Sequence, residues 1–156
     1  MIKGKMTSLR SPETTLKEFR AAAKEELRPL IQHWHTEMLA EHFKPSAVAK
    51  YGYQKRTVKH QKRKARMFHH QNPLEFTGEL KRSVTQRIRI TSTSKSATGR
   101  MRAPRYLYMY GKTGPHMHDE ITAITQDEID ELSTILHDAI TKRLNTAREP
   151  RELVFR

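Results

Sequence analysis

Apolar residues recur at helical spacing over the first quarter of the chain. Ser11-Pro12-Glu13 is a helix-start signal, with Ser as the cap and Pro at the first helical position, so a helix is predicted from there to about His42. Pro29 lies inside this segment and lacks a backbone N–H, which predicts a kink or a break nearby. Trp34 is interpreted as a core anchor. The apolar stripe consists of Leu16, Phe19, Ala23, Leu27, Leu30, Ile31, Trp34, Met38 and Leu39.

A second helix, over residues 126–145, is the best determined by its pattern. Thr125 and Glu128 have the spacing of a capping box, and the acids of the first turn and the basic residues Lys142 and Arg143 of the last turn suit the helix dipole. Asp127, Asp130, Glu131 and Asp138 are interpreted as its solvated face. Its apolar stripe consists of Ile129, Leu132, Ile135, Leu136, Ile140 and Leu144.

Between these helices the period changes to two. Ile88 and Ile90 alternate with polar residues and predict a strand. Residues 92–100 read as a polar turn, residues 101–110 as a second strand that carries Tyr106, Tyr108 and Tyr110 on one side, and residues 120–125 as a short third strand. The sequence therefore predicts an α+β fold, a small antiparallel sheet packed against an N-terminal and a C-terminal helix. The two longer strands and the helix 126–145 are expected to form the core.

The stretch LEFTGELKRSV, residues 74–84, predicts a short helical turn from 78 to 84. The Thr77 hydroxyl can accept a hydrogen bond from a backbone N–H two or three residues later and so cap this turn. Thr77 and Gly78 are therefore interpreted as a structural turn and not as a catalytic site. The residues expected to converge on its apolar side are Leu74, Phe76, Leu80 and Val84.

The domain organisation predicted is a single domain over residues 12–145, with an N-terminal arm (1–11) and a C-terminal arm (146–156). Hydrophobic residues make up 35% of the chain and the mean hydropathy is -0.83, both low for a self-sufficient globule, so assembly with neighbours is expected to bury further surface. In the C-terminal arm, Leu153, Val154 and Phe155 either add to the sheet or groove of a neighbour or fray in solution.

Positive charge is concentrated in one segment. The formal net charge is +13, and residues 50–70 contain no acid at all. A short helix over about 56–67 and an extended arm both fit this segment. Its cations could contact phosphates, with Tyr51 or Tyr53 stacking on bases, or an acidic protein surface such as segment 119–138 of a neighbouring subunit. The candidate contact residues are Lys50, Lys55, Arg56, Lys59, Lys62, Arg63, Lys64 and Arg66.

Little in the sequence points to catalysis. There is no cysteine, which excludes disulfides, thiol catalysis and Cys-based zinc sites, and there is no Walker loop, dinucleotide fingerprint, GxSxG elbow or HExxH pattern. His33 and His35 would diverge on a helix, whereas His116 and His118 could chelate a metal if extended. We expect no enzyme activity, no cofactor and no metal. The N-terminus has no signal-peptide core and no stretch is long enough to span a bilayer, which predicts a soluble protein.

Four motifs in order resemble the small neck proteins of tailed bacteriophages, the tail-completion, tail-terminator and head–tail joining group. The first is a helix that ends in HFKPSAVAKYGYQKR, residues 42–56. The second is a Lys/Arg-rich segment that leads into PLEFTGELKRSV, residues 73–84, which is similar to the PL(V)xTGxLxxS stretch of such proteins. A strand, polar tip and strand follow, and EITAITQDEIDEL, residues 120–132, looks like the strand-to-helix ending of those chains.

The resemblance implies a structural role. Such proteins form α+β rings, commonly with six-fold or twelve-fold symmetry, at the junction of capsid and tail. They contact tail-tube or portal-side proteins, and packaged DNA lies along the ring axis. For this chain it implies a homo-oligomer in the virion, assembled in the host cytoplasm, with no catalytic residue and no cofactor. The alternative from another class is a free-standing DNA- or RNA-binding protein.

Overall fold

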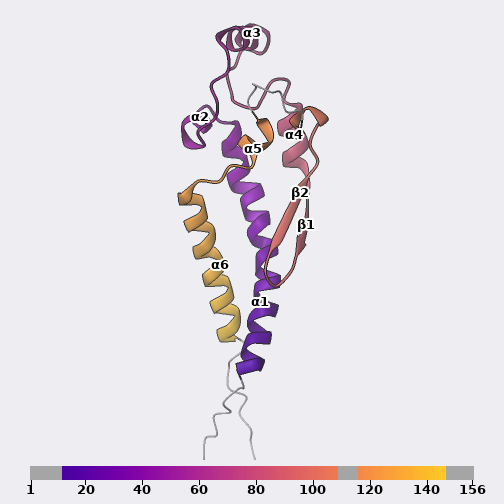
Figure 1. Ribbon diagram of the computed structural model, residues 1–156, viewed down its shortest axis with the longest axis vertical. Helices are drawn as coiled ribbons and strands as arrows, with labels where there is room; N and C mark the ends of the chain where they lie inside the picture. Colours follow the sequence, from indigo (N-terminus) through magenta and orange to yellow (C-terminus); the bar gives the residue numbers. More distant parts are fainter. Residues whose placement is uncertain (1–11, 109–115, 147–156) are drawn as a thin grey trace, which may run out of the picture.

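The computed structural model describes residues 12–108 and 116–146, which form an elongated α+β arrangement (Figure 1). The long helix α1 (Pro12–His33) runs along the length of the molecule. Helix α6 (Gln126–Thr146) packs along α1, and a hairpin of β1 (Ile88–Ser92) and β2 (Ala97–Met101) packs on another side of it. The predicted fold class, a small antiparallel sheet packed with an N-terminal and a C-terminal helix, is confirmed. We call α1, α6 and the hairpin the shaft.

The shorter elements gather at one end of the shaft and form what we call the head, residues 34–86, 103–108 and 116–121 (Figure 1). The elements of the head are the π-helical turn η1 (Trp34–Met38), the 3-10 turns η2 (Leu39–Phe43) and η3 (Arg105–Tyr108), and the helices α2 (Ala47–Lys50), α3 (Val58–Phe68), α4 (Glu79–Gln86) and α5 (Met117–Ile121).

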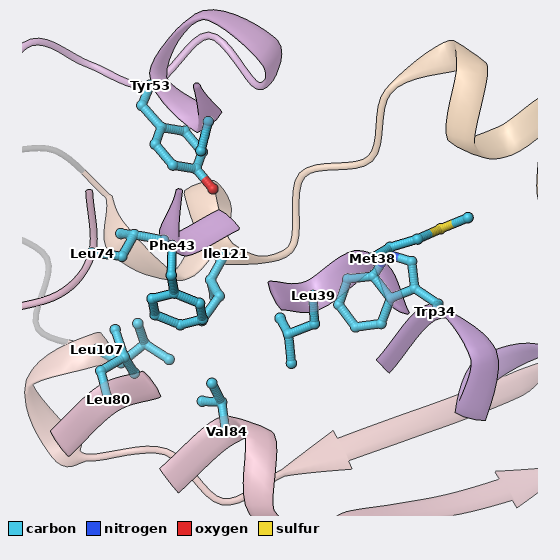
Figure 2. Close-up of a cluster of buried hydrophobic side chains, with 11 residues drawn as sticks. Trp34, Met38, Leu39, Phe43, Tyr53, Leu74, Leu80, Val84, Leu107 and Ile121 are labelled. Carbon is cyan, nitrogen blue, oxygen red and sulfur yellow. The ribbon is translucent and has the colours of Figure 1, made fainter. Parts of the chain in front are cut away.

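The hydrophobic core lies in the head, where side chains from η1, η2, α4, η3 and α5 meet (Figure 2). The expectation that the sheet and the C-terminal helix form the core is wrong: Ile88 and Ile90 are only half-buried, and no apolar side chain of α6 is fully buried. In the shaft, where a two-stranded hairpin and two long helices provide few layers, the buried apolar side chains are the small ones of Ala22 and Ala23. The core consists of Trp34, Met38, Leu39, Phe43, Ala47, Tyr53, Leu74, Leu80, Val84, Leu107 and Ile121.

The two predicted strands after β1 are also wrong. The hairpin turn is tighter than expected, because the backbone N–H of Thr93 donates to the Ser96 carbonyl at 2.7 Å and the Thr93 hydroxyl accepts from the N–H of Ser96 at 3.1 Å. The second strand therefore begins at Ala97, and the tyrosines predicted on it fall on the 3-10 turn η3 or outside the described residues. In the segment predicted as a third strand, Glu120 and Ile121 form the end of α5, where Ile121 is buried, and residues 122–125 form a turn and loop.

Pro29 does not end the N-terminal helix. Helix α1 continues through Pro29, which is exposed, so the break predicted there is wrong. The departure from α-helical geometry comes at Trp34, where the π-helical turn begins. Trp34 is buried, as predicted, together with His35 and Met38 of the same turn.

The predicted capping features are present. The Thr125 N–H donates to Glu128 at 3.1 Å and the Glu128 N–H donates to the Thr125 hydroxyl at 3.3 Å, so the capping box is confirmed. At α4, the Thr77 hydroxyl accepts from the Glu79 N–H at 3.4 Å, and Gly78 has a φ of +78°, a conformation that favours glycine. Three of the four side chains predicted to converge there join the core. The exception is Phe76, which packs edge-to-face on Phe68 of α3.

The close approach of the hairpin to α1 depends on Gly99, which faces Ile90 across the strands. A Cβ atom at Gly99 would lie 2.6 Å from the Ile88 Cδ1 and 3.0 Å from the Ile31 Cγ2 of α1. We predict that Gly99→Val lowers the free energy of unfolding by about 1–3 kcal/mol through overpacking, measured by urea denaturation. Thr98→Val, on the exposed side of the same strand, is the matched control. Equal stability of the two variants would contradict this packing.

Candidate functional site

The basic segment begins at Lys50, the last residue of α2, and three of its cations are bound internally. Lys50 pairs with Glu128 at 2.7 Å, Arg56 pairs with Glu120, and the Lys64 ammonium donates to the Asn72 carbonyl. Lys64 is buried, and this burial lowers its pKa below the ordinary value. These three residues were predicted to contact a partner, but the structure uses them to fix the segment to the rest of the head.

The strongest of these contacts is the pair formed by Arg56 and Glu120. Two guanidinium nitrogens of Arg56 reach the two carboxylate oxygens of Glu120, at 2.9 and 2.5 Å. The backbone N–H of Gln54 donates to the same carboxylate at 3.0 Å. Glu120 is buried, so this bidentate pair has little competition from water. It fixes the extended stretch that leads into α3.

A second buried carboxylate, Glu128, holds the other end of the stretch. It accepts hydrogen bonds from the Tyr51 hydroxyl at 2.5 Å, from the Lys50 ammonium at 2.7 Å and from the Thr125 N–H at 3.1 Å. Burial opposes ionisation of Glu128, but the hydrogen bonds from these three groups outweigh it and hold the pKa of the carboxyl below its ordinary value. The first turn of α6 is thereby linked to the end of α2.

His42 lies between these two carboxylates in the interior. Its ring is fully buried and stacks on Tyr51, with 3.9 Å between the ring centroids. Its Nδ1 lies 2.5 Å from the Tyr53 hydroxyl and 3.1 Å from the backbone carbonyl of Glu120. Burial lowers the pKa of His42 to about 4, and burial raises the pKa of both tyrosines. The imidazole is therefore neutral at pH 7.

This arrangement corrects the expectation that Tyr51 or Tyr53 stacks on nucleic-acid bases. Tyr53 is buried in the core, and Tyr51 uses its ring on His42 and its hydroxyl on Glu128. Both rings are structural. Sequence reasoning missed the contact of His42 with the Glu120 carbonyl and the pairing of Arg56 with Glu120, since each joins residues more than sixty positions apart and Glu120 falls in a segment predicted as a strand.

Four of the five remaining cations are presented on α3, which projects at the far end of the head (Figure 1). Residues spaced i, i+3, i+4 and i+7 share one side of a helix. Four cations of α3 follow this spacing. Each of them is exposed, and none pairs with an acid in the part of the chain that the structure describes. We call these four residues the basic stripe: Lys59, Lys62, Arg63 and Arg66.

The other side of α3 is attached to the loop before α4. Phe68 packs on Phe76 with 4.7 Å between ring centroids, and buried Lys64 holds the Asn72 carbonyl. The Thr57 hydroxyl accepts a hydrogen bond from the His60 N–H at 3.3 Å and caps the start of the helix. The basic stripe is therefore carried by an ordered helix, the first of the two forms that the sequence allowed.

Beneath α3 lies an open cleft of about 590 Å³. Its lining is mostly apolar. It also includes Lys55, an exposed cation of the basic segment that precedes α3. The predicted turn residue Thr77 lies on its wall, in agreement with a structural role. The apolar part of the lining comes from Pro45, Val48, Pro73, Phe76, Tyr106 and Met117.

No metal centre is formed within residues 12–108 and 116–146, where no three His, Asp or Glu side chains come together in a suitable way. His35 donates from Nε2 to the Val84 carbonyl at 2.7 Å, and His118 lies on helix α5 and not on an extended strand. None of the described helices has the length and apolar character needed to cross a membrane. The predicted arm residues Leu153, Val154 and Phe155 lie outside the described residues.

Comparison with known proteins gives no relative. Neither the family models, nor the curated proteins, nor the solved structures contain a match to this chain.

The buried imidazole predicts a specific pH dependence. Because the folded pKa of His42 is about 4 and the unfolded value is 6.5, its contribution to stability is complete above pH 6.5 and is lost as the pH falls to 4. The loss is about 3 kcal/mol at 1.36 kcal/mol per pKa unit. His42→Phe keeps a ring against Tyr51 and should flatten the slope of unfolding free energy between pH 4 and 6.5. An unchanged slope, or an NMR titration of His42 near 6.5, would contradict the assignment.

Proposed function

We propose that the protein is a structural subunit of the bacteriophage head–tail junction, where it forms a homo-oligomeric ring that completes or terminates the tail and joins it to the capsid connector. The order of the sequence motifs that resemble neck proteins supports this proposal, as does the α+β fold. The role is one of assembly and not of catalysis. Its partners are further copies of the chain and the tail-tube or portal-side proteins.

Three of the four motifs that carry the resemblance contribute to the core and its polar anchors. Residues 42–56 supply His42 and both tyrosines, residues 73–84 supply three side chains of the core, and residues 120–132 supply Ile121 and the two buried carboxylates. Segments that lie far apart in the sequence thus build one core with its polar anchors. Their joint occurrence in the sequence is accounted for by one structural unit.

Exposed apolar side chains on the shaft are the observation that carries the proposed assembly. Leu16 and Phe19 of α1 are 49% and 46% exposed, and Ile129 of α6 is 44% exposed. The large side chains of the core lie in the head, and the buried apolar side chains of α1 are the small Ala22 and Ala23, so the exposed apolar side chains of the shaft gain from burial by another chain. A ring of copies, each contacting the next through the shaft, would remove this apolar surface from water.

We predict that the purified chain self-associates and that Phe19→Ser with Ile129→Ser shifts it towards the monomer. The measurement is the mass by sedimentation velocity at increasing protein concentration. Tyr108→Ser, which changes an exposed aromatic residue of the head, is the control and should leave the mass distribution unchanged. Because the shaft residues are exposed, their replacement should leave the unfolding temperature near that of the wild type.

The location is tested in particles. Phage assembled without this protein should accumulate filled heads and separate tails, since the junction would be incomplete. Particles that assemble normally in its absence would overturn the proposed function, whatever the mass of the isolated chain.

Nucleic-acid binding is the second candidate function, and the basic stripe is what favours it. Four lysine and arginine contacts with phosphates of duplex DNA would give log K against log salt a slope of about −3.6. Tight binding by a monomer with that slope would favour this candidate. Weak binding, together with assembly of the chain into rings, would favour the structural role.

A further inference from the structure

Helix α6 carries a set of acids that mirrors the basic stripe. At 100° per residue, its exposed acids fall within about 100° of the helix circumference, on the side away from the half-buried Leu132. Glu131 also approaches His33, at 3.7 Å, and Asp130 accepts a hydrogen bond from Gln126. We call the four residues the acidic stripe: Asp127, Asp130, Glu131 and Asp138.

The two stripes are opposite in charge and share the spacing of their first three residues. The basic residues 59, 62 and 63 and the acidic residues 127, 130 and 131 both follow the spacing i, i+3, i+4. At 1.5 Å per residue the basic stripe is about 10 Å long and the acidic stripe about 16 Å, so the first fits within the second. Each stripe occupies a similar arc of its helix, and two such helices can lie against each other with opposite charges in contact.

The numbers of opposite charges in the two segments also match once the charges bound within the chain are subtracted. Segment 50–70 contains eight cations and no acid, and segment 119–138 contains seven acids and no lysine or arginine. Three of the cations are bound within the chain, Lys50 to Glu128, Arg56 to Glu120 and Lys64 to the Asn72 carbonyl. Five cations and five acids remain, and among the described residues none of these five cations pairs with any of these five acids.

The two stripes do not meet within one chain. Helix α3 projects beyond the head, whereas α6 runs away from the head along the shaft (Figure 1). No ion pair or hydrogen bond joins α3 to α6 in the described part of the protein. The partner that satisfies both stripes at once is therefore a second copy of this chain.

We propose that the basic stripe of one copy docks on the acidic stripe of the next. This inference rests on the proposed self-assembly and names the contact that orders it. The two surfaces are different, so the contact is heterologous and repeats from copy to copy, which closes into a ring when the rotation allows. Exposed ion pairs contribute modestly to affinity, so the stripes determine which surfaces meet, while burial of the apolar shaft supplies most of the association energy.

The test reverses each stripe separately and then both together. Lys59→Glu with Lys62→Glu makes α3 acidic, and Asp130→Lys with Asp138→Lys makes α6 basic. Each double variant should weaken self-association by roughly tenfold or more, because like charges then face each other. The quadruple variant should recover it, since its stripes are again opposite in sign. An equimolar mixture of the two double variants should also assemble.

The control is Arg89→Glu with Arg100→Glu, two exposed arginines that face each other across the hairpin. It changes the net charge as much as the reversal on α3 does, and it should leave self-association unchanged. All variants alter exposed side chains, and their unfolding temperatures verify that the fold is retained. The readout is sedimentation velocity at two salt concentrations, with the wild-type association weaker at the higher one.

The outcomes separate the docking contact from the proposed function. If the wild type assembles and neither reversal changes its mass, the docking contact is overturned and the structural role stands. If the wild type is monomeric at every concentration, the docking contact is overturned. The structural role is then decided by whether phage particles assemble without the protein. If the α3 reversal abolishes binding to duplex DNA while the quadruple variant fails to reassemble, the basic stripe binds nucleic acid and not a second copy.

Discussion

Two buried carboxylates fix the basic segment to the rest of the protein, and they determine the positions of Lys50 and Arg56. Glu120 and Glu128 are both almost fully removed from solvent. A buried carboxylate without a partner is strongly destabilising, so each of them requires a donor. The basic segment contains donors and no acid, and the donors that reach these carboxylates are Arg56, Lys50 and Tyr51. The pairing joins parts of the chain that are more than sixty residues apart and fixes the start of α6 to the head.

The anchors also determine which cations face solvent. Once Lys50 and Arg56 are engaged at the base, and Lys64 and Phe68 fasten the inner side of α3, the helix has one orientation left. Its outer side then presents four like charges that have no acidic partner in the described structure. The density of positive charge in the sequence thus has two causes, internal anchoring and external presentation, which composition alone does not separate.

The parts of the fold that sequence predicts are those with local causes. The apolar periods of α1 and α6, the alternation at Ile88 and Ile90, and the capping box at Thr125 all depend on residues a few positions apart. The parts that sequence does not predict depend on distant partners. The stacking of His42 on Tyr51 and the pairing of Arg56 with Glu120 leave no mark on any local spacing.

Local sequence patterns also do not predict the location of the core. Periodicity indicates which side of α6 is apolar but does not indicate how many layers cover it, and α1 covers only part of it. The start of the second strand has a local cause, because hydrogen bonds between Thr93 and Ser96 close the turn early. The candidate site was therefore predicted as a set of cations, whereas its division into bound and free members required the structure.

An ordered basic helix differs from a basic tail in what it can select. A flexible tail must lose conformational freedom when it binds, and it can adapt to any polyanion. The capped and anchored α3 has already lost that freedom in folding, so its four charges keep a fixed spacing. A partner surface whose charges match this spacing binds α3 more tightly than one that has only the same net charge. Three residues of the acidic stripe of α6, Asp127, Asp130 and Glu131, repeat the spacing of Lys59, Lys62 and Arg63 on a helix, which favours one defined contact between copies over diffuse attraction.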